Sequence, residues 1–162
     1  MATSSPTTWS SGHWRTMPDQ PGELFELPDV NVLVALTNPS HQHHGAAHSW
    51  LSRVERFATT PITESGLVRL LLNRSVTGQE VTGRQAVDLL HRLRAHQRTT
   101  FLPDDSTLAS AVIDLAGLGG HTQTTDFHLV NLAAAHGGVL TTFDGRLPKQ
   151  LTGQDQRHVR VL

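Results

Sequence analysis

The sequence contains no cysteine, and neither sign of charge is in clear excess. The absence of cysteine excludes disulfides, thiolate metal sites and a cysteine nucleophile. With 13 basic and 14 acidic residues the formal net charge is −1, which argues against a protein that grips nucleic acid by bulk positive charge. Any contact with a nucleic acid must therefore be local and made by a few side chains.

Long apolar runs and a signal peptide are also missing. No apolar stretch approaches the roughly 20 residues that a membrane-spanning helix needs. The amino end has no cationic start followed by an apolar core. We therefore expect no membrane association and a cytoplasmic location. The 162 residues suit one domain of ordinary size with a real hydrophobic core.

Residues 1–22 are rich in Ser, Thr, Pro and Gly, with Trp9 and Trp14 as the only large apolar anchors. This composition is typical of a flexible N-terminal extension, so we place the folded domain at residues 23–162. The two tryptophans leave two roles open for the extension, which are docking onto the domain and binding a partner.

Four acidic residues each stand at the edge of an apolar segment. Asp29 lies between Leu27-Pro28 and Val30, and a carboxylate buried in such a run needs a partner or a metal ion to offset its lost hydration. Taken singly, each of the four is explained as a helix cap, a turn residue or a charge that favours a helix N-terminus. A set of four is harder to explain in this way. The four are Asp29, Glu64, Asp126 and Asp144.

The order and the local contexts of these four residues carry a family resemblance. The contexts are Pro-Asp-Val-Asn-Val-Leu, Thr-Glu-Ser-Gly-Leu-Val-Arg, Thr-Asp-Phe-His-Leu-Val-Asn-Leu-Ala and Leu-Thr-Thr-Phe-Asp-Gly. As an ordered set they resemble the PIN-domain ribonucleases, and most of all the VapC toxins of VapBC toxin–antitoxin pairs. The resemblance runs from about Glu23 to Leu162. One departure is Pro28, which interrupts strand hydrogen bonding, although a strand end accommodates proline.

The resemblance implies a fold and a chemistry. The fold is an α/β/α sandwich on a mostly parallel sheet, with the acidic residues gathered at the carboxyl ends of strands. The chemistry is metal-dependent RNA cleavage by an endoribonuclease, with Mg²⁺ or Mn²⁺ held by carboxylates. Such an ion can lower the pKa of a water and orient it for in-line attack on phosphorus. We expect Asp29 and Asp126 to be the principal ligands, Glu64 and Asp144 to complete the site directly or through water, and Asn31 and Thr142 to support it.

The resemblance also implies partners. These are single-stranded or looped RNA as substrate, a second copy of the chain in a homodimer that forms the RNA groove, and a VapB-like antitoxin that inserts a segment into that groove. Arg69, Arg74 and Arg146 are the basic residues nearest to the acidic motifs, so they are candidates for phosphate contacts. His128 also lies near, but a role in surface solubility is the simpler interpretation for it.

Two other functions remain open from the sequence. The main alternative is a PIN-like RNA-binding or assembly module with negligible catalysis, although four intact carboxylates count against it. A second alternative is a zinc site in the tract His41–His48, where His44 and His48 would share one helix face. No third ligand lies near them, and a solvated helix start explains the tract more simply.

The remaining pattern predicts the secondary structure around these motifs. Apolar periodicity alone would extend the first strand through Leu36, whereas the resemblance ends it at Asp29 and makes 30–36 a helix. We follow the resemblance. The pattern further predicts a helix over 107–116 that is capped by Asp104 and Asp105. The other expected elements are strands over 57–60, 99–102, 139–142 and 157–162, and helices over 44–56, 64–73 and 84–95 and after Asp126.

Overall fold

A five-stranded sheet forms the centre of the protein. The computed structural model describes residues 24–162, so the prediction of an extension over 1–22 lies outside the described residues. The strands are β1 (Glu26–Pro28), β2 (Phe57–Thr59), β3 (Thr99–Phe101), β4 (Val139–Thr142) and β5 (Val159–Val161). Their order is β3-β2-β1-β4-β5, and every neighbouring pair is parallel.

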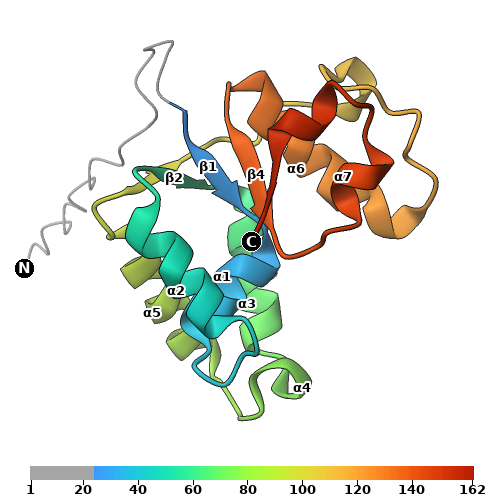
Figure 1. Cartoon of the computed structure of the whole chain (residues 1–162). Coiled ribbons are helices and arrows are strands. Elements are labelled where there is room, and N and C mark those ends of the chain that lie inside the picture. Colours follow the sequence, from blue (N-terminus) through green and yellow to red (C-terminus); the bar gives the residue numbers. More distant parts are fainter. Residues whose placement is uncertain (1–23) are drawn as a thin grey trace, which may run out of the picture.

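Helices cover both faces of this sheet, as Figure 1 shows. One face is covered by helices whose buried side chains form a core with Phe57 of β2. The other face carries α6 and α7, whose buried residues pack with Leu27 and Leu140 of the two central strands. The predicted α/β/α sandwich is therefore confirmed. The helices are α1 (Val30–Thr37), α2 (His44–Arg53), α3 (Pro61–Leu71), α4 (Arg74–Thr77), α5 (Gly83–Arg94), α6 (Thr124–Ala135) and α7 (Leu147–Gln150).

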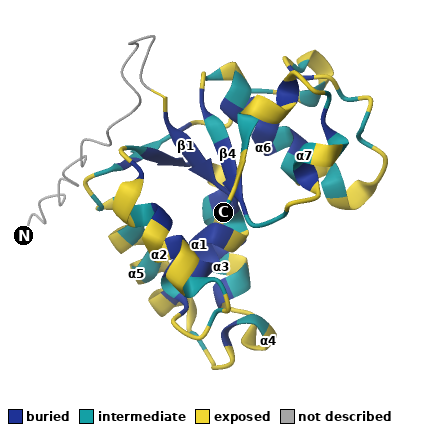
Figure 2. Ribbon diagram, in the orientation of Figure 1, coloured by how far each residue is buried: buried dark blue, intermediate teal, exposed yellow. Residues whose placement is uncertain are grey.

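The chain leaves the sheet at Asp29. The amide of Asp29 still donates to the carbonyl of Thr141 on β4 (2.8 Å), whereas the carbonyl of Asp29 accepts from Val32 and Leu33 in the first turn of α1. The predicted helix after Asp29 is thus confirmed over the longer strand. Helix α1 is buried over 32–36 because it lies between the sheet and its neighbours α2 and α3 (Figure 2).

A buried glutamate ties β1 to three other elements. Glu26 is 6% exposed, and its Oε2 accepts from Trp50 Nε1 of α2 (2.7 Å) and from Thr141 Oγ1 of β4 (2.6 Å). Its Oε1 pairs with the guanidinium of Arg160 on β5. This carboxylate has a cation and two hydrogen-bond donors, which is how a buried charge is normally accommodated.

The predicted helix over 107–116 is wrong. Only a 3₁₀ turn, η1 (Leu108–Ser110), forms there. The amide of Val112 donates to Asn131 Oδ1 of α6 (2.8 Å), and the amide of Asp114 donates to Asp155 Oδ2 (2.9 Å). Side chains from distant parts of the chain therefore satisfy backbone groups that a helix would have used internally.

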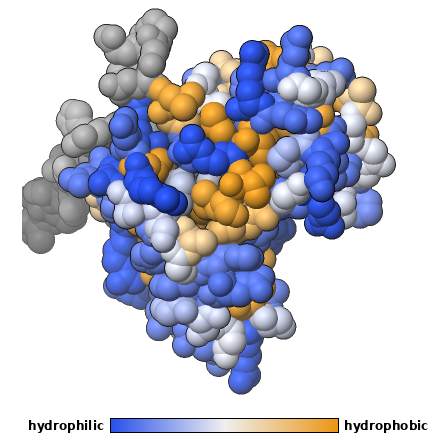
Figure 3. Space-filling view, in the orientation of Figure 1, coloured by the Kyte–Doolittle hydropathy of each residue, from blue (hydrophilic) through white to orange (hydrophobic). Residues whose placement is uncertain are grey.

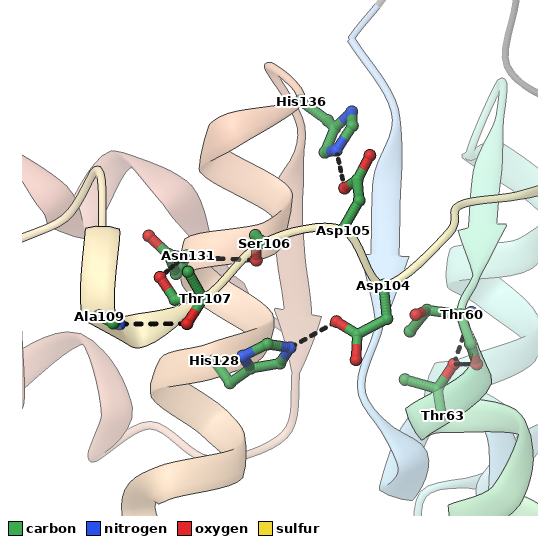
Figure 4. Close-up of polar contacts among 10 residues, drawn as sticks. All are labelled: Thr60, Thr63, Asp104, Asp105, Ser106, Thr107, Ala109, His128, Asn131 and His136. Carbon is green, nitrogen blue, oxygen red and sulfur yellow. Dashed lines mark hydrogen bonds and ion pairs between the residues drawn. The ribbon is translucent and has the colours of Figure 1, made fainter.

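The predicted capping role of Asp104 and Asp105 is wrong for the same reason. Asp104 Oδ1 lies 2.6 Å from His128 Nε2, and Asp105 Oδ1 lies 2.7 Å from His136 Nε2 (Figure 4). The surface role expected for His128 is also wrong, because its side chain is 17% exposed and paired. Both aspartates fasten the segment after β3 to α6.

Strands β3 and β5 are the two edges of the sheet, and β5 confirms the predicted edge strand at the end of the chain. Figure 3 shows a largely hydrophilic face on which apolar side chains gather around the end of the chain. Val161 is 43% exposed there. None of the helices within residues 24–162 combines the length and the apolar character that crossing a bilayer requires.

Helices α1 and α3 approach each other closely at Gly66. A Cβ atom placed on Gly66 would lie 2.7 Å from Val30 Cγ2 and 3.1 Å from Cγ1. Valine has little freedom to turn away because its χ1 is restricted in a helix. Glycine at 66 is therefore required by packing, and Val30 is the residue next to Asp29.

We predict that Gly66→Ala lowers the free energy of unfolding by about 1–3 kcal/mol, because overpacking outweighs the better helix propensity of alanine. Urea denaturation measures this change. Gly45→Ala in α2 is the matched control, since nothing lies within 4 Å of the added Cβ, and it should gain up to about 1 kcal/mol. Equal stabilisation by both substitutions would contradict the close packing of α1 and α3.

Candidate active site

Three of the four predicted acidic residues lie at one edge of the sheet. Strands β1 and β4 are parallel neighbours, with Pro28 opposite Thr141. Asp29 follows β1 directly, and Asp144 follows β4 after one intervening residue. Asp126 is in the first turn of α6. The carboxyl ends of parallel strands are where open α/β sheets bind their ligands.

Asp29 is buried, with 8% of its surface exposed. Its Oδ2 accepts from Thr142 Oγ1 (3.2 Å), and Asn31 Nδ2 lies at 3.5 Å from the same atom. Burial raises the pKa of Asp29, although the Thr142 and Asn31 side chains and the amides of Val30 and Asn31 act in the opposite direction. The predicted supporting residues Asn31 and Thr142 thus both contact Asp29. Their hydrogen bonds lower its pKa, but desolvation remains the larger influence.

Asp126 shows that the acidic residues act on one another. The pKa of Asp126 is raised to about 6, first by burial and then by the negative charges of Asp29 and Asp144. Like charges that share a site raise one another's pKa in this way. The three carboxylates therefore form one electrostatic unit, which we call the acidic triad (Asp29, Asp126 and Asp144).

Asp144 is held by an arginine within its own turn. Arg146 donates from Nε to Oδ1 (3.0 Å) and from Nη2 to Oδ2 (3.1 Å), and its backbone amide donates to Oδ1 (2.9 Å). These bonds hold the pKa of Asp144 below its usual value. The amide of Asp144 donates in turn to Thr142 Oγ1 (3.1 Å). The Thr142 hydroxyl therefore links the Asp29 carboxylate to the turn that carries Asp144.

Glu64 is bonded to residues outside the acidic triad. Its Oε1 accepts from Thr59 Oγ1 (2.6 Å), and its Oε2 lies 3.5 Å from Arg94 Nη1 of α5. The Arg94 guanidinium also lies over the ring of Phe101, 4.5 Å from its centroid. Sequence reasoning missed both partners. Arg94 lies 30 residues after Glu64 on another helix, so no local pattern indicates the pair.

Two hollows that share lining residues lie along α3. The first, of 430 Å³, is lined by residues that neighbour the triad in sequence, Val30 and Thr125, and by residues of α3. The second, of 710 Å³, lies between α3 and α5 and is lined by Glu64 and Arg94 together with the apolar side chains of Val68, Leu72 and Leu90. Pro61, Ser65 and Arg69 line both hollows. Arg69 therefore lies close both to Glu64 and to the sequence neighbours of Asp29 and Asp126, whereas Arg74 is exposed at the start of α4.

The donor set suits a hard divalent cation. Carboxylates are the ligands that Mg²⁺ and Mn²⁺ prefer, and the repulsion that raises the pKa of Asp126 is a cost that such a cation would remove. In the side-chain orientations of residues 24–162, no three His, Cys, Asp or Glu groups converge closely enough to hold an ion. Asp144 and Glu64 would have to turn from Arg146 and Arg94 to join the other two.

The histidine tract does not form such a site. His44 Nδ1 lies 2.7 Å from the carbonyl of Ala35, and His48 Nε2 lies 3.2 Å from the carbonyl of Leu36. The two rings share a helix face, as expected, with centroids 4.3 Å apart. One nitrogen of each ring is engaged by the carboxyl end of α1, which disfavours the zinc alternative.

Because the pKa of Asp126 is raised, replacing its carboxyl by a neutral group should increase the free energy of unfolding by an amount that depends on pH. The folded group keeps its proton up to about pH 6, whereas the unfolded group loses it near 3.8. This contribution to stability is therefore complete below the unfolded pKa and is lost as the pH rises through 6. In EDTA, Asp126→Asn should raise the free energy of unfolding by about 1–2 kcal/mol at pH 8, a value reduced for the partial exposure of the group. Urea denaturation at pH 8 and pH 4 measures the effect, and a gain that is equal at both pH values would contradict it.

Comparison with known proteins agrees with this geometry. The PIN domain family model matches residues 27–150, a range that contains Asp29, Glu64, Asp126 and Asp144. Among the similar proteins are three of Mycobacterium tuberculosis that match over most of the chain. Ribonuclease VapC39 is 44% identical over 127 residues, which cover 76% of this chain and 91% of that protein.

The other two are similar at nearly the same level. Ribonuclease VapC29 is 40% identical over 122 residues, covering 75% of this chain and 86% of that protein. Ribonuclease VapC38 is 39% identical over 120 residues, covering 73% and 84%. A family model that spans most of the sheet and all of the triad, together with relatives at this identity, leads to one assignment: the chain belongs to the PIN domain family and is a VapC-type ribonuclease.

Proposed function

We propose that this protein is the endoribonuclease toxin of a VapBC toxin–antitoxin pair and that it cleaves RNA with a divalent metal ion. The observation that carries the metal-dependent part is the acidic triad, where burial and the negative charges of Asp29 and Asp144 raise the pKa of Asp126. A fold that gathers three carboxylates at the carboxyl edge of its sheet is suited to hold a cation there.

The acidic residues bind the metal ion, and two neighbouring polar residues support them. Asp29 and Asp126 are the principal ligands for Mg²⁺ or Mn²⁺, and Asp144 and Glu64 complete the site after turning from their arginines. When bound, the ion lowers the pKa of the attacking water and neutralises charge at the scissile phosphate. Thr142 keeps Asp29 and the Asp144 turn in register through its hydroxyl. Asn31 adds a second polar contact to Asp29.

Positive side chains near the triad receive the RNA backbone. Arg69 is the best placed of them because it lines both hollows beside the acidic residues. Arg146 is 83% exposed and bound to Asp144, so release of Asp144 to the metal ion would free its guanidinium for a phosphate. Arg74, exposed at the start of α4, extends the basic surface beyond α3. These contacts suit a single-stranded or looped RNA.

The partners follow from the same surface. The hollow between α3 and α5 has apolar walls, and Leu72 there is 47% exposed. We propose that the protein is a homodimer whose two copies form the RNA groove, that a VapB-like antitoxin inserts a segment into that groove, and that the toxin works in the cytoplasm. Exposed apolar side chains rimmed by charge are typical of surfaces that bind another protein.

Cleavage of total cellular RNA by the purified, antitoxin-free protein tests the proposal. We expect cleavage with Mg²⁺ or Mn²⁺ and none in EDTA. Asp29→Asn should reduce the rate by about 100-fold or more, since losing a ligand should cost at least as much as losing an outer-shell group. Asp88→Asn is the matched control, because Asp88 is an exposed carboxylate on α5 whose side chain is 58% exposed.

Three other outcomes would count against the proposal. Equal cleavage by Asp29→Asn and wild type would point to a contaminating nuclease. Cleavage that persists in EDTA would exclude the metal. No cleavage by the folded wild type would favour an RNA-binding or assembly module with negligible catalysis.

A further inference from the structure

The segment after β3 crosses α6 and is bonded to it at three levels. We call residues 104–112 the strap. Asp104 pairs with His128 and Asp105 pairs with His136, at 2.6 and 2.7 Å (Figure 4). Between them lies Asn131, which is fully buried and which accepts from the amide of Val112 (2.8 Å). The Asn131 amide nitrogen also donates to Ser106 Oγ (3.3 Å) and to the carbonyl of Thr107 (3.5 Å).

The strap is anchored in the sheet just before Asp104. Leu102 is 1% exposed, and its amide donates to the carbonyl of Thr59 at the end of β2 (2.8 Å). Asp104 follows this fixed point by two residues. A side chain of α6 that is bonded to Asp104 is therefore tied to the sheet itself.

The two aspartate–histidine pairs meet α6 at different distances from the acidic triad. His128 lies two residues after Asp126, and two residues correspond to about 200° around a helix, so the two side chains leave α6 on nearly opposite sides. His136 caps the other end of α6, ten residues after Asp126. The pair at His128 thus holds the turn that carries Asp126 from its far side, whereas the pair at His136 does not.

The turn that carries Asp126 needs such a hold. Burial and the negative charges of Asp29 and Asp144 both disfavour a charged Asp126 in this position, and helix α6 is the element that keeps it there. A metal ion binds best to ligands that are already in place, and outer-shell contacts that orient ligands commonly change metal affinity by about 10–100-fold.

We propose that Asp104 and His128 are positioning residues of the active site, whose bond fixes the first turns of α6 and holds Asp126 beside Asp29 and Asp144. This inference rests on the proposed role of the triad as a metal site. The pair formed by Asp105 and His136 has the same chemistry but contributes to stability alone.

Mn²⁺ binding to the full chain without RNA tests this role, with calorimetry as the measurement and urea denaturation beside it. Asp104→Ala should raise the dissociation constant for Mn²⁺ by about 10-fold. Asp105→Ala, the adjacent residue of the strap, is the matched control and should leave the constant within about twofold of wild type. At saturating Mn²⁺, RNA cleavage by Asp104→Ala should recover.

Variants of the histidine separate positioning from direct ligation. His128→Leu should weaken Mn²⁺ binding as much as Asp104→Ala does, and the double variant should be no weaker than either. His128→Gln retains an N–H donor for Asp104 and should recover part of the affinity. Weakening by Asp104→Ala without weakening by His128→Leu would make Asp104 a ligand and would overturn the positioning role.

The result also distinguishes this role from the function on which it rests. Wild-type binding that Asp104→Ala and His128→Leu both retain unchanged, or that the Asp105→Ala control weakens equally, would overturn the positioning role alone. A wild type that binds no Mn²⁺ would overturn both the positioning role and the metal-dependent function.

Discussion

The electrostatic repulsion among Asp29, Asp126 and Asp144 is the constraint on which the rest of this structure depends. Strands β1 and β4 bring two of these carboxylates together because they are parallel neighbours in the sheet. Helix α6 adds the third, Asp126, whose pKa is raised to about 6 by burial and by the negative charges of the other two. The buried Glu26 on the same strand as Asp29 is paired with Arg160, whereas Asp29 has only neutral donors around it. The fold thus neutralises one buried carboxylate of β1 and leaves the other available for a cation.

Arginines offset part of the negative charge of the acidic residues in the metal-free protein. Arg146 holds Asp144, and Arg94 lies beside Glu64. Both carboxylates are thereby kept out of the orientation in which they could join Asp29 and Asp126. Binding of a metal ion would exchange these internal cations for an external one, and it would release Arg146 for the RNA. Catalytic assembly and RNA binding would then be coupled through the same side chains.

The sequence predicted where three of the acidic residues lie in the fold but not the contacts around them, and the reason is physical. The short contexts around Asp29, Asp126 and Asp144 are local, so one sequence is enough to place them at strand ends and at a helix start. The partners of Glu64 and the strap are set by long-range contacts. Asn131 and Asp155 take the amides of Val112 and Asp114 and thereby prevent the predicted helix over 107–116. No local pattern reveals that competition, nor does any reveal that Asp104 bonds to a histidine 24 residues away.

The most direct measurement of the central interaction is the titration of the Asp126 carboxyl by ¹³C NMR in metal-free protein. We expect a pKa of about 6 in the wild type, since burial and two negative charges act on this group. Asp29→Asn and Asp144→Asn should each lower that pKa toward its ordinary value, and added Mg²⁺ should lower it further. An Asp126 that titrates near 3.8 in the wild type, or that does not respond to either substitution, would show that the three carboxylates do not share one site.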